Sequence, residues 1–129
     1  MKIALLMLLL ASASQSFAQN DQYLSLDDCA KAIKANPKNS MAHYRMGEIF
    51  FMNEEWNHAS LEFLNAQRGD LDPKWIEVWS HIYAGMTYDL TGQRPRAINE
   101  YRWALSTGDN TRGALDQAAK YIESPYKRP

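Results

Sequence analysis

The sequence has few of the residues that cross-link a chain or give it a strong charge. Its 129 residues include a single cysteine, so no internal disulfide can form and packing alone must stabilise the fold. Lysine plus arginine number 14 and aspartate plus glutamate 15, so the net charge is near zero and no basic patch is visible. Because binding to nucleic acid requires clustered positive charge opposite the phosphates, the sequence argues against a nucleic-acid partner.

Motifs for catalysis, phosphate binding and metal binding are also missing. The six glycines occur singly, and no Gly-x-Ser-x-Gly elbow surrounds a serine. The acidic pairs Asp27–Asp28 and Glu54–Glu55 fall at predicted helix starts, where the helix dipole explains them. Zinc ligands usually include short-spaced pairs, but His43, His58 and His81 are well separated. We therefore expect no enzyme activity, no cofactor and no bound metal.

Residues 1–18 have the pattern of an export signal. Lys2 supplies a positive charge, an apolar run follows, and the segment ends on Ser16, Phe17 and Ala18, which places small residues where signal peptidase cleaves. The apolar run is shorter than the roughly 20 residues that a membrane-spanning helix requires. We predict cleavage after Ala18 and a periplasmic or secreted mature chain that is not inserted in a membrane.

The rest of the chain is predicted to be all-α. Apolar residues recur at helical spacing, turn-forming residues separate these runs, and no segment shows sustained period-two alternation. Residues 19–24 are predicted as a flexible lead and residues 124–129 as a short tail. The expected helices cover residues 25–35, about 40–52, 55–68, 73–90, 94–106 and 111–123.

One series of residue types occurs twice, 38 positions apart. The first copy consists of Gly47, Phe50, Ala59, Phe63 and Ala66, and the second of Gly85, Tyr88, Ala97, Tyr101 and Ala104. A glycine, an aromatic residue, then a small, an aromatic and a small residue in a partner helix resembles the tetratricopeptide repeat. Three features depart from the family pattern: the interval is 38 rather than about 34 residues, histidine stands where the family often has tryptophan, and the terminal proline is displaced in the first copy and absent after the second.

The resemblance implies an α-solenoid of helical hairpins. The repeat units would cover about 40–72 and 74–109, preceded by an N-terminal helix and closed by a capping helix at 111–123. Within each unit, the glycine is expected to let the two helices approach closely where Ala59 or Ala97 faces it. The aromatic residues of the partner helices would fill the gap between successive units.

In the tetratricopeptide family the first helix of each unit lines a concave groove, so the resemblance also implies which residues face a ligand. Most of these residues are apolar or aromatic, and contiguous apolar patches of this kind usually mark a contact surface. The alternative is that a neighbouring segment, such as the turn at Trp75, folds over and buries them. The predicted groove residues are Met41, Tyr44, Glu48, Phe51, Trp75, Trp79, Ile82, Met86 and Asp89.

The function predicted from this surface is that of a protein-interaction module, an adaptor or scaffold. A helix or an extended segment of an unidentified protein would dock in the groove, with Trp79, Tyr44 and Met86 as anchors. Because Glu48 and Asp89 occupy positions where a carboxylate clamp would need basic or amide groups, the ligand is expected to be apolar or weakly basic.

A second reading is a structural protein that self-associates. The groove or Cys29 would then join two copies into a homodimer, although Cys29 on a short helix is most simply a small core residue. A small metal- or ligand-binding protein is a third reading, which the separated histidines do not favour.

Overall fold

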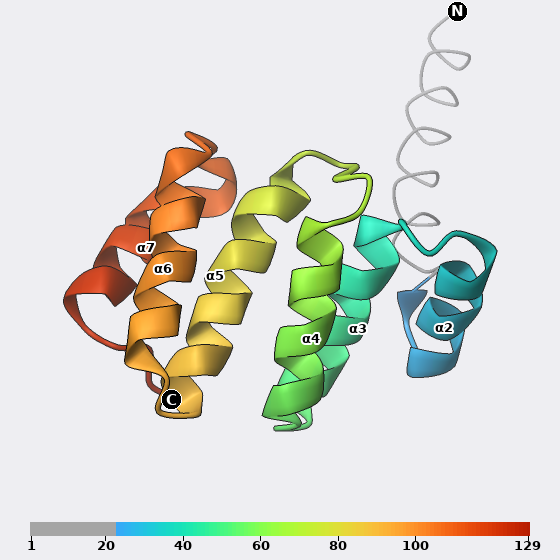
Figure 1. Ribbon diagram of the computed structural model, residues 1–129, viewed down its shortest axis with the longest axis horizontal. Helices are drawn as coiled ribbons and strands as arrows, with labels where there is room; N and C mark the ends of the chain where they lie inside the picture. Colours follow the sequence, from blue (N-terminus) through green and yellow to red (C-terminus); the bar gives the residue numbers. More distant parts are fainter. Residues whose placement is uncertain (1–22) are drawn as a thin grey trace, which may run out of the picture.

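The computed structural model describes residues 23–129, and within them the fold is all-helical with no strand (Figure 1). The all-α prediction is confirmed. The helices are α2 (Leu26–Ala35), α3 (Ser40–Met52), α4 (Trp56–Gln67), α5 (Trp75–Leu90), α6 (Arg94–Ser106), the short 3-10 turn η2 (Thr111–Gly113) and α7 (Ala114–Glu123). In the described part of the chain, no helix is long and apolar enough to cross a membrane. The predicted signal peptide, and most of the predicted lead, lie outside the described residues.

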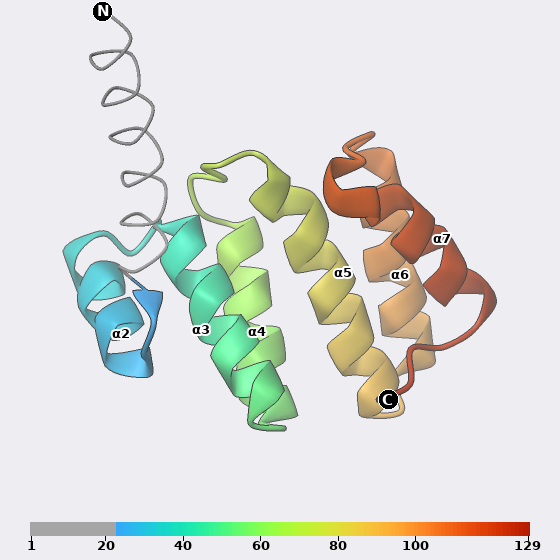
Figure 2. The ribbon, with the colours of Figure 1, turned by 180° about the vertical axis from the view of Figure 1, so that it is seen from behind.

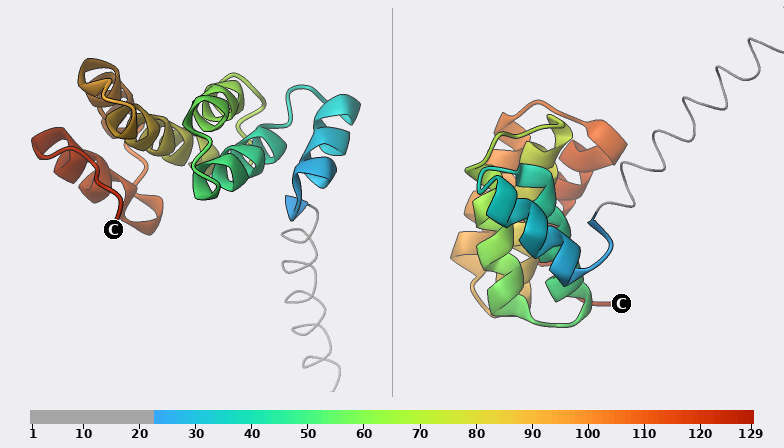
Figure 3. Two further views of the ribbon diagram at one scale, coloured as in Figure 1. Left: turned by 90° about the horizontal axis from the view of Figure 1, so that it is seen from below. Right: turned by 90° about the vertical axis from the view of Figure 1, so that its right-hand side faces the viewer.

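The helices pack in chain order as a row of antiparallel pairs. Helix α3 pairs with α4 and α5 with α6, while α4 also packs on α5, α6 on α7 and α2 on α3. Figure 1 shows α4 and α6 in front, and the opposite view shows α3 and α7 in front (Figure 2). Seen from below, α2 stands at one end of the row and α6 with α7 at the other (Figure 3).

Both hairpins close on a contact between a glycine and an aromatic ring. A Cβ atom on Gly47 would lie 2.7 Å from the Phe63 ring, and one on Gly85 would lie 2.4 Å from the Tyr101 ring. The predicted close approach at the glycines is therefore present, but the nearest atoms are ring carbons of Phe63 and Tyr101 rather than the facing alanines. The Phe63 ring also stacks on Tyr83 of the next hairpin at 5.0 Å between centroids, so it does fill the gap between units.

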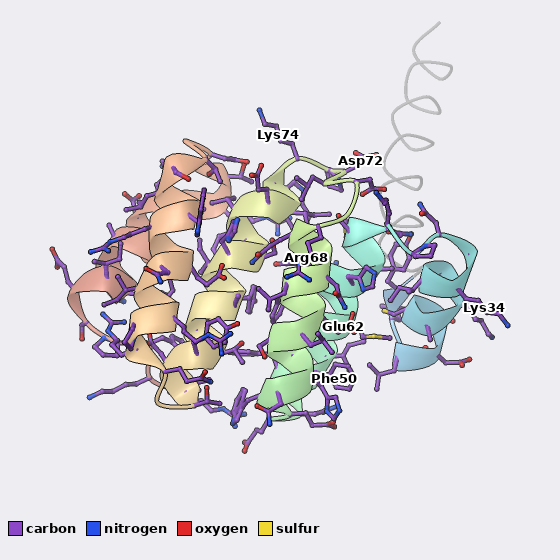
Figure 4. All side chains as sticks on the ribbon, viewed as in Figure 1. Lys34, Phe50, Glu62, Arg68, Asp72 and Lys74 are labelled. Atoms are coloured by element: carbon purple, nitrogen blue, oxygen red, sulfur yellow. The ribbon has the colours of Figure 1, made fainter. Side chains whose placement is uncertain are left out.

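The connection between α4 and α5 absorbs the longer repeat interval. Helix α5 has 16 residues and α3 has 13, and the extra residues lie at the start of α5. A Cβ on Gly69 would lie 2.3 Å from Ser40 Oγ, so this glycine is needed for close approach rather than as a left-handed helix cap. Buried Ser40 donates to Ala66 O at 2.7 Å and accepts from Leu71 N at 2.9 Å, which fixes the connection to α3. Lys74 extends away from the helices at this connection (Figure 4).

The last predicted helix, residues 111–123, is divided in the structure. Arg112 and Gly113 both have left-handed backbone, with φ of 55° and 71°. This conformation interrupts the helical hydrogen bonds, so α7 begins only at Ala114. Residues 111–113 therefore form a turn instead of the start of the helix, and this turn reaches α5.

Candidate functional site

The predicted groove residues belong to α3 and α5, and the face on which the partly exposed ones lie is here called the groove face. Tyr44 and Ile82 belong to the core, at 3% and 0% exposed, so neither offers a partner an exposed surface in this arrangement. The anchor role predicted for Tyr44 is therefore not available. The side chain of Asp89 is only 1% exposed. The residues that remain partly exposed are Met41, Glu48, Phe51, Trp75, Trp79 and Met86.

Tyr44 is covered by aromatic rings from α4 and α5. Its ring centroid lies 5.3 Å from Trp75, 5.8 Å from Tyr83 and 5.9 Å from Phe63, all in edge-to-face geometry. Burial raises the pKa of the Tyr44 hydroxyl, and burial raises that of Tyr83 to about 12. The turn at Trp75 thus covers part of the groove face. This agrees with the alternative prediction that a neighbouring segment folds over the groove residues and buries them. Tyr83 was not among the predicted residues, because it lies two positions before Gly85, a position that the resemblance does not assign to the groove.

One end of the groove face is covered by the turn before α7. The indole nitrogen of Trp79 donates to Thr111 O at 3.0 Å. The Arg112 guanidinium lies 4.9 Å from the centre of the Trp75 ring, a cation–π contact. Trp79 therefore holds this turn in place, and only part of its side chain is free for a partner.

The middle of the groove face carries an ion pair. Arg45 Nη1 donates to Glu48 Oε1 at 2.8 Å, with the side chains 33% and 23% exposed. Burial raises the pKa of the Glu48 carboxyl, and the Arg45 charge opposes that shift. This charge lies between Met41 and Phe51 on α3, so the stripe is apolar at its ends and polar at its centre.

Asp89 joins three segments of the chain. Its two carboxylate oxygens accept from Arg94 Nη1, each at 3.0 Å, and Oδ2 also accepts from the Tyr101 hydroxyl at 2.7 Å and from Tyr126 N at 2.9 Å. Burial, followed by the hydrogen bond to Asp89, raises the pKa of the Tyr101 hydroxyl. In this arrangement Asp89 is occupied by donors of the chain itself. It ties α5 and α6 to the residues after α7.

Residues 124–129, called the return segment below, turn back from the end of α7 toward the end of α5 (Figure 2). The Tyr126 ring contacts Tyr121 at 5.3 Å and Phe51 at 6.2 Å between centroids. Arg128 forms an ion pair with Glu54 and lies 5.7 Å from the centre of the Trp56 ring. Sequence reasoning treated this segment only as a tail, because its partners lie on distant helices and no local pattern indicates them.

An open hollow of 370 Å³ lies beside the Arg128 contact. It is formed by the α3–α4 turn, the start of α4 and one residue from the α5–α6 turn. Its lining residues are Glu54, Glu55, Trp56, Asn57, His58 and Thr91. No group of three or more His, Cys, Asp or Glu side chains in residues 23–129 is arranged to hold a metal ion.

Each hairpin also contains a histidine–glutamate pair. His43 Nδ1 lies 2.7 Å from Glu62 Oε2, and His81 Nδ1 lies 2.7 Å from Glu100 Oε2; Glu62 lies on the side of α4 toward α3 (Figure 4). His43 Nε2 lies 2.8 Å from a second acceptor, the carbonyl oxygen of Pro37. With an acceptor at both ring nitrogens, His43 is satisfied as the imidazolium. The hydrogen bond to Glu62 raises the pKa of His43, the Pro37 carbonyl adds to the shift, and burial opposes it.

Cys29 lies in the core, as the simplest prediction had it. It is 0% exposed, and its thiol faces Tyr23 O at 3.9 Å. Burial, aided by the Asp28 charge, raises its pKa to about 11. A thiol that is protonated at neutral pH and enclosed does not favour the intermolecular disulfide considered for a homodimer.

No family model matches the chain, and no curated protein or solved structure matches it either.

Proposed function

We propose that the chain is a tetratricopeptide-type protein-interaction module, exported by its predicted signal and free of cofactors, that binds a peptide or helical segment on the groove face. The repeat assignment is supported by contacts that recur at a 38-residue shift. Gly47 meets Phe63 as Gly85 meets Tyr101, and the two histidine–glutamate distances are equal at 2.7 Å. Repeated contacts of this kind require two hairpins of closely similar geometry.

The observation that carries the interaction function is the partly exposed apolar stripe on α3 and α5. Met41, Phe51 and Met86 pack on the core with one side and remain partly exposed on the other. Methionine adapts its flexible side chain to different ligands, and aromatic residues supply much of the binding energy at interfaces. The stripe lies on helices that are already packed, so binding does not require the backbone of this surface to become ordered.

Selection from a displayed peptide library tests this proposal. We expect enriched peptides to bind the wild-type chain and to lose most of their affinity for Met86→Lys, which places a charge on the stripe. Leu61→Lys is the matched control, because Leu61 is 53% exposed on α4, away from α3 and α5. Peptides that bind both lysine variants equally, or the absence of any enriched peptide, would contradict the proposal. Circular dichroism checks that each variant keeps its helices.

The solution mass of the chain separates this module from a self-associating protein. A monomer with the groove face free supports binding of outside partners. A dimer that persists in reductant and dissociates in Met86→Lys would show that a second copy occupies the face. Burial of Cys29 leads us to expect no effect of reductant on the mass.

A further inference from the structure

We propose that the return segment is a self-bound ligand at one end of the groove face, where Phe51 and Asp89 adjoin Glu54 and Trp56, and that the outside partner of this site is a segment carrying an aromatic residue followed two positions later by arginine. This inference rests on the interaction function proposed above and names the chemistry of its ligand. It also assigns a regulatory role to residues 124–129, which must leave before an outside segment binds.

The main chain of the return segment is held where it approaches α5 and α6. Tyr126 N donates to Asp89 Oδ2 at 2.9 Å, and Arg94 Nη2 donates to Ile122 O at 2.7 Å, just before the segment begins. Contacts to main-chain atoms do not depend on side-chain identity. Asp89 therefore forms a docking point for the main chain of an extended segment, while Arg94 fixes the end of α7 beside it.

The side chains of the return segment supply the specificity. The Tyr126 ring lies against Phe51 and Tyr121, and the Arg128 guanidinium contacts both the Glu54 carboxylate and the Trp56 ring. Lys127 between them is exposed and forms no hydrogen bond or ion pair within residues 23–129. Alternate side chains of an extended chain point to the same side, so the site reads positions one and three and leaves the middle position free.

The charges on the two sides of this contact are complementary. Glu54 is acidic and pairs with Arg128, and Lys127 and Arg128 make the segment basic. The Asp89 charge is already paired with Arg94. An aromatic ring stacked beside an arginine on an acidic rim is a common arrangement for recognising basic segments. The ligand deduced from these contacts is weakly basic, in agreement with the expectation from the positions of Glu48 and Asp89.

The segment is held by few contacts, so it can be displaced. Ser124, Pro125, Lys127 and Arg128 are exposed, and only Tyr126 is partly buried. Segments with so few buried contacts open at a small fraction of the global unfolding free energy. Its covalent connection nevertheless holds it near the site at an effective concentration of the order of millimolar, so an outside segment must compete with it.

The test uses the full chain and a labelled peptide of sequence Ser-Pro-Tyr-Lys-Arg-Pro, followed by fluorescence polarisation. In Tyr126→Ser/Arg128→Ser the return segment loses both side-chain contacts, and we expect this variant to bind the peptide at least ~10-fold more tightly than the wild type. Lys127→Ser is the matched control and should bind as weakly as the wild type. A peptide with serine in place of tyrosine should not bind. If the double variant loses its helices, Arg128→Glu, at an exposed side chain, replaces it with the same expectation.

Each result decides the inference. Equal peptide binding by the wild type and the double variant, or no binding by the folded double variant, would overturn it. So would a wild-type dimer that dissociates in the double variant, because a second copy would then supply the segment. The interaction function fails separately: library peptides that bind through Met86 but do not compete with the tail peptide leave that function intact and reject this inference. Conversely, if the double variant binds the tail peptide but no library peptide is enriched, the interaction function through Met86 is rejected and the contact of the return segment stands.

Discussion

The two hairpins share one frame but differ in the residues at one end. Two positions that are aromatic in the first hairpin are charged in the second, since Phe51 and Trp56 correspond to Asp89 and Arg94. At a third position, Phe63 corresponds to Tyr101, which keeps the ring and adds a hydroxyl. In the first hairpin, the Phe51 and Trp56 rings meet edge to face at 5.2 Å. In the second, the corresponding residues form the Asp89–Arg94 ion pair with the Tyr101 hydroxyl bonded to the same carboxylate.

This difference shows that the two hairpins keep a similar backbone while the side chains at this end differ in polarity and charge. An aromatic cluster is stabilised by its buried area, and each ring contributes largely by itself. A buried carboxylate is stable only while its donors remain, so the second hairpin depends on all members of its network. The return segment contacts both versions, since Tyr126 lies on Phe51 with its ring and on Asp89 with its main-chain nitrogen.

The largest effect is expected from Asp89→Ala. The substitution leaves the partly exposed Arg94 charge without its partner and removes the acceptor of the Tyr101 hydroxyl. Loss of one partner of a fully buried ion pair costs about 3–5 kcal/mol, and because Arg94 is 28% exposed we expect the lower end of that range. Urea unfolding followed by circular dichroism measures the change in the free energy of unfolding. Phe51→Ala, at the matching position of the first hairpin, removes a partly exposed ring and should cost less.

A triple variant tests whether the side chains alone cause the difference between the two hairpins. The triple variant Asp89→Phe/Arg94→Trp/Tyr101→Phe gives the second hairpin the residues of the first. We expect it to recover most of the stability that Asp89→Ala loses, because replacing a buried ion pair by packed apolar residues is often neutral. A triple variant no more stable than Asp89→Ala would show that the frames differ beyond these side chains.

The glycine contacts rank second. In both hairpins an added Cβ meets a ring at less than 3 Å, with the shorter approach, 2.4 Å, at Gly85. Overpacking costs about 1–3 kcal/mol and the better helix propensity of alanine returns up to about 1 kcal/mol, so we expect a net loss of about 1–2 kcal/mol for each Gly→Ala. Gly85→Ala should lose more than Gly47→Ala in urea unfolding. A gain in stability for either would contradict the packing argument.

The His43–Glu62 pair should make the free energy of unfolding depend on pH, and this dependence should differ between the wild type and His43→Gln. The pKa of His43 is raised in the folded state, mainly by its hydrogen bond to Glu62. A raised pKa stabilises the fold fully below the unfolded value of 6.5, and this stabilisation is lost as the pH rises through the folded pKa. Unfolding measured from about pH 5.5 to about pH 8.5 should show this loss in the wild type but not in His43→Gln.

The matched control for that experiment is His81→Gln. His81 has the equivalent glutamate, but within the described residues its second ring nitrogen has no counterpart to the Pro37 carbonyl. The control should keep the contribution of His43 to the pH dependence. A wild-type stability that rises with pH above 6.5, or a His43→Gln profile identical to that of the wild type, would reject the assignment.

Sequence reasoning predicted the helices well because their signals are local. Ser25 caps α2 as expected, with Asp28 N donating to its hydroxyl at 3.1 Å, and α6 has the predicted bounds. The repeat also placed Gly47 and Gly85 at close helix contacts. The break before α7 was missed because Arg112 adopts left-handed backbone. Arginine rarely has this conformation, so its presence in a helical pattern gives no sign of a break.

The candidate site was predicted less well, because its state depends on contacts between distant segments. Helical periodicity places Tyr44 and Trp79 on one stripe, but it cannot show that Trp75 covers the first or that Thr111 accepts from the second. The role of Asp89 was missed for the same reason, since its donors come from α6 and from the return segment. The sequence indicates which residues share a face, and only the packing of later segments decides which of them remain exposed.

The smallest expected effect concerns the two hairpin turns, where Glu54 and Gly92 are equivalent. Both have left-handed backbone, with φ of 63° and 72°, but only Gly92 adopts it without strain. Because no atom lies within 4 Å of a Cβ at Gly92, Gly92→Ala should lose only the conformational cost, about 1 kcal/mol.

Glu54→Gly relieves the same strain in the first turn, but it also removes the ion pair with Arg128, and an exposed pair contributes about 0.2–1 kcal/mol. The two contributions separate in Arg128→Ser, where the pair is already absent. There Glu54→Gly should stabilise the fold by about 1 kcal/mol, and in the wild type it should gain less. Equal gains in the two backgrounds would mean that the Glu54–Arg128 pair contributes nothing to stability, and that Arg128 holds the return segment through the Trp56 ring alone.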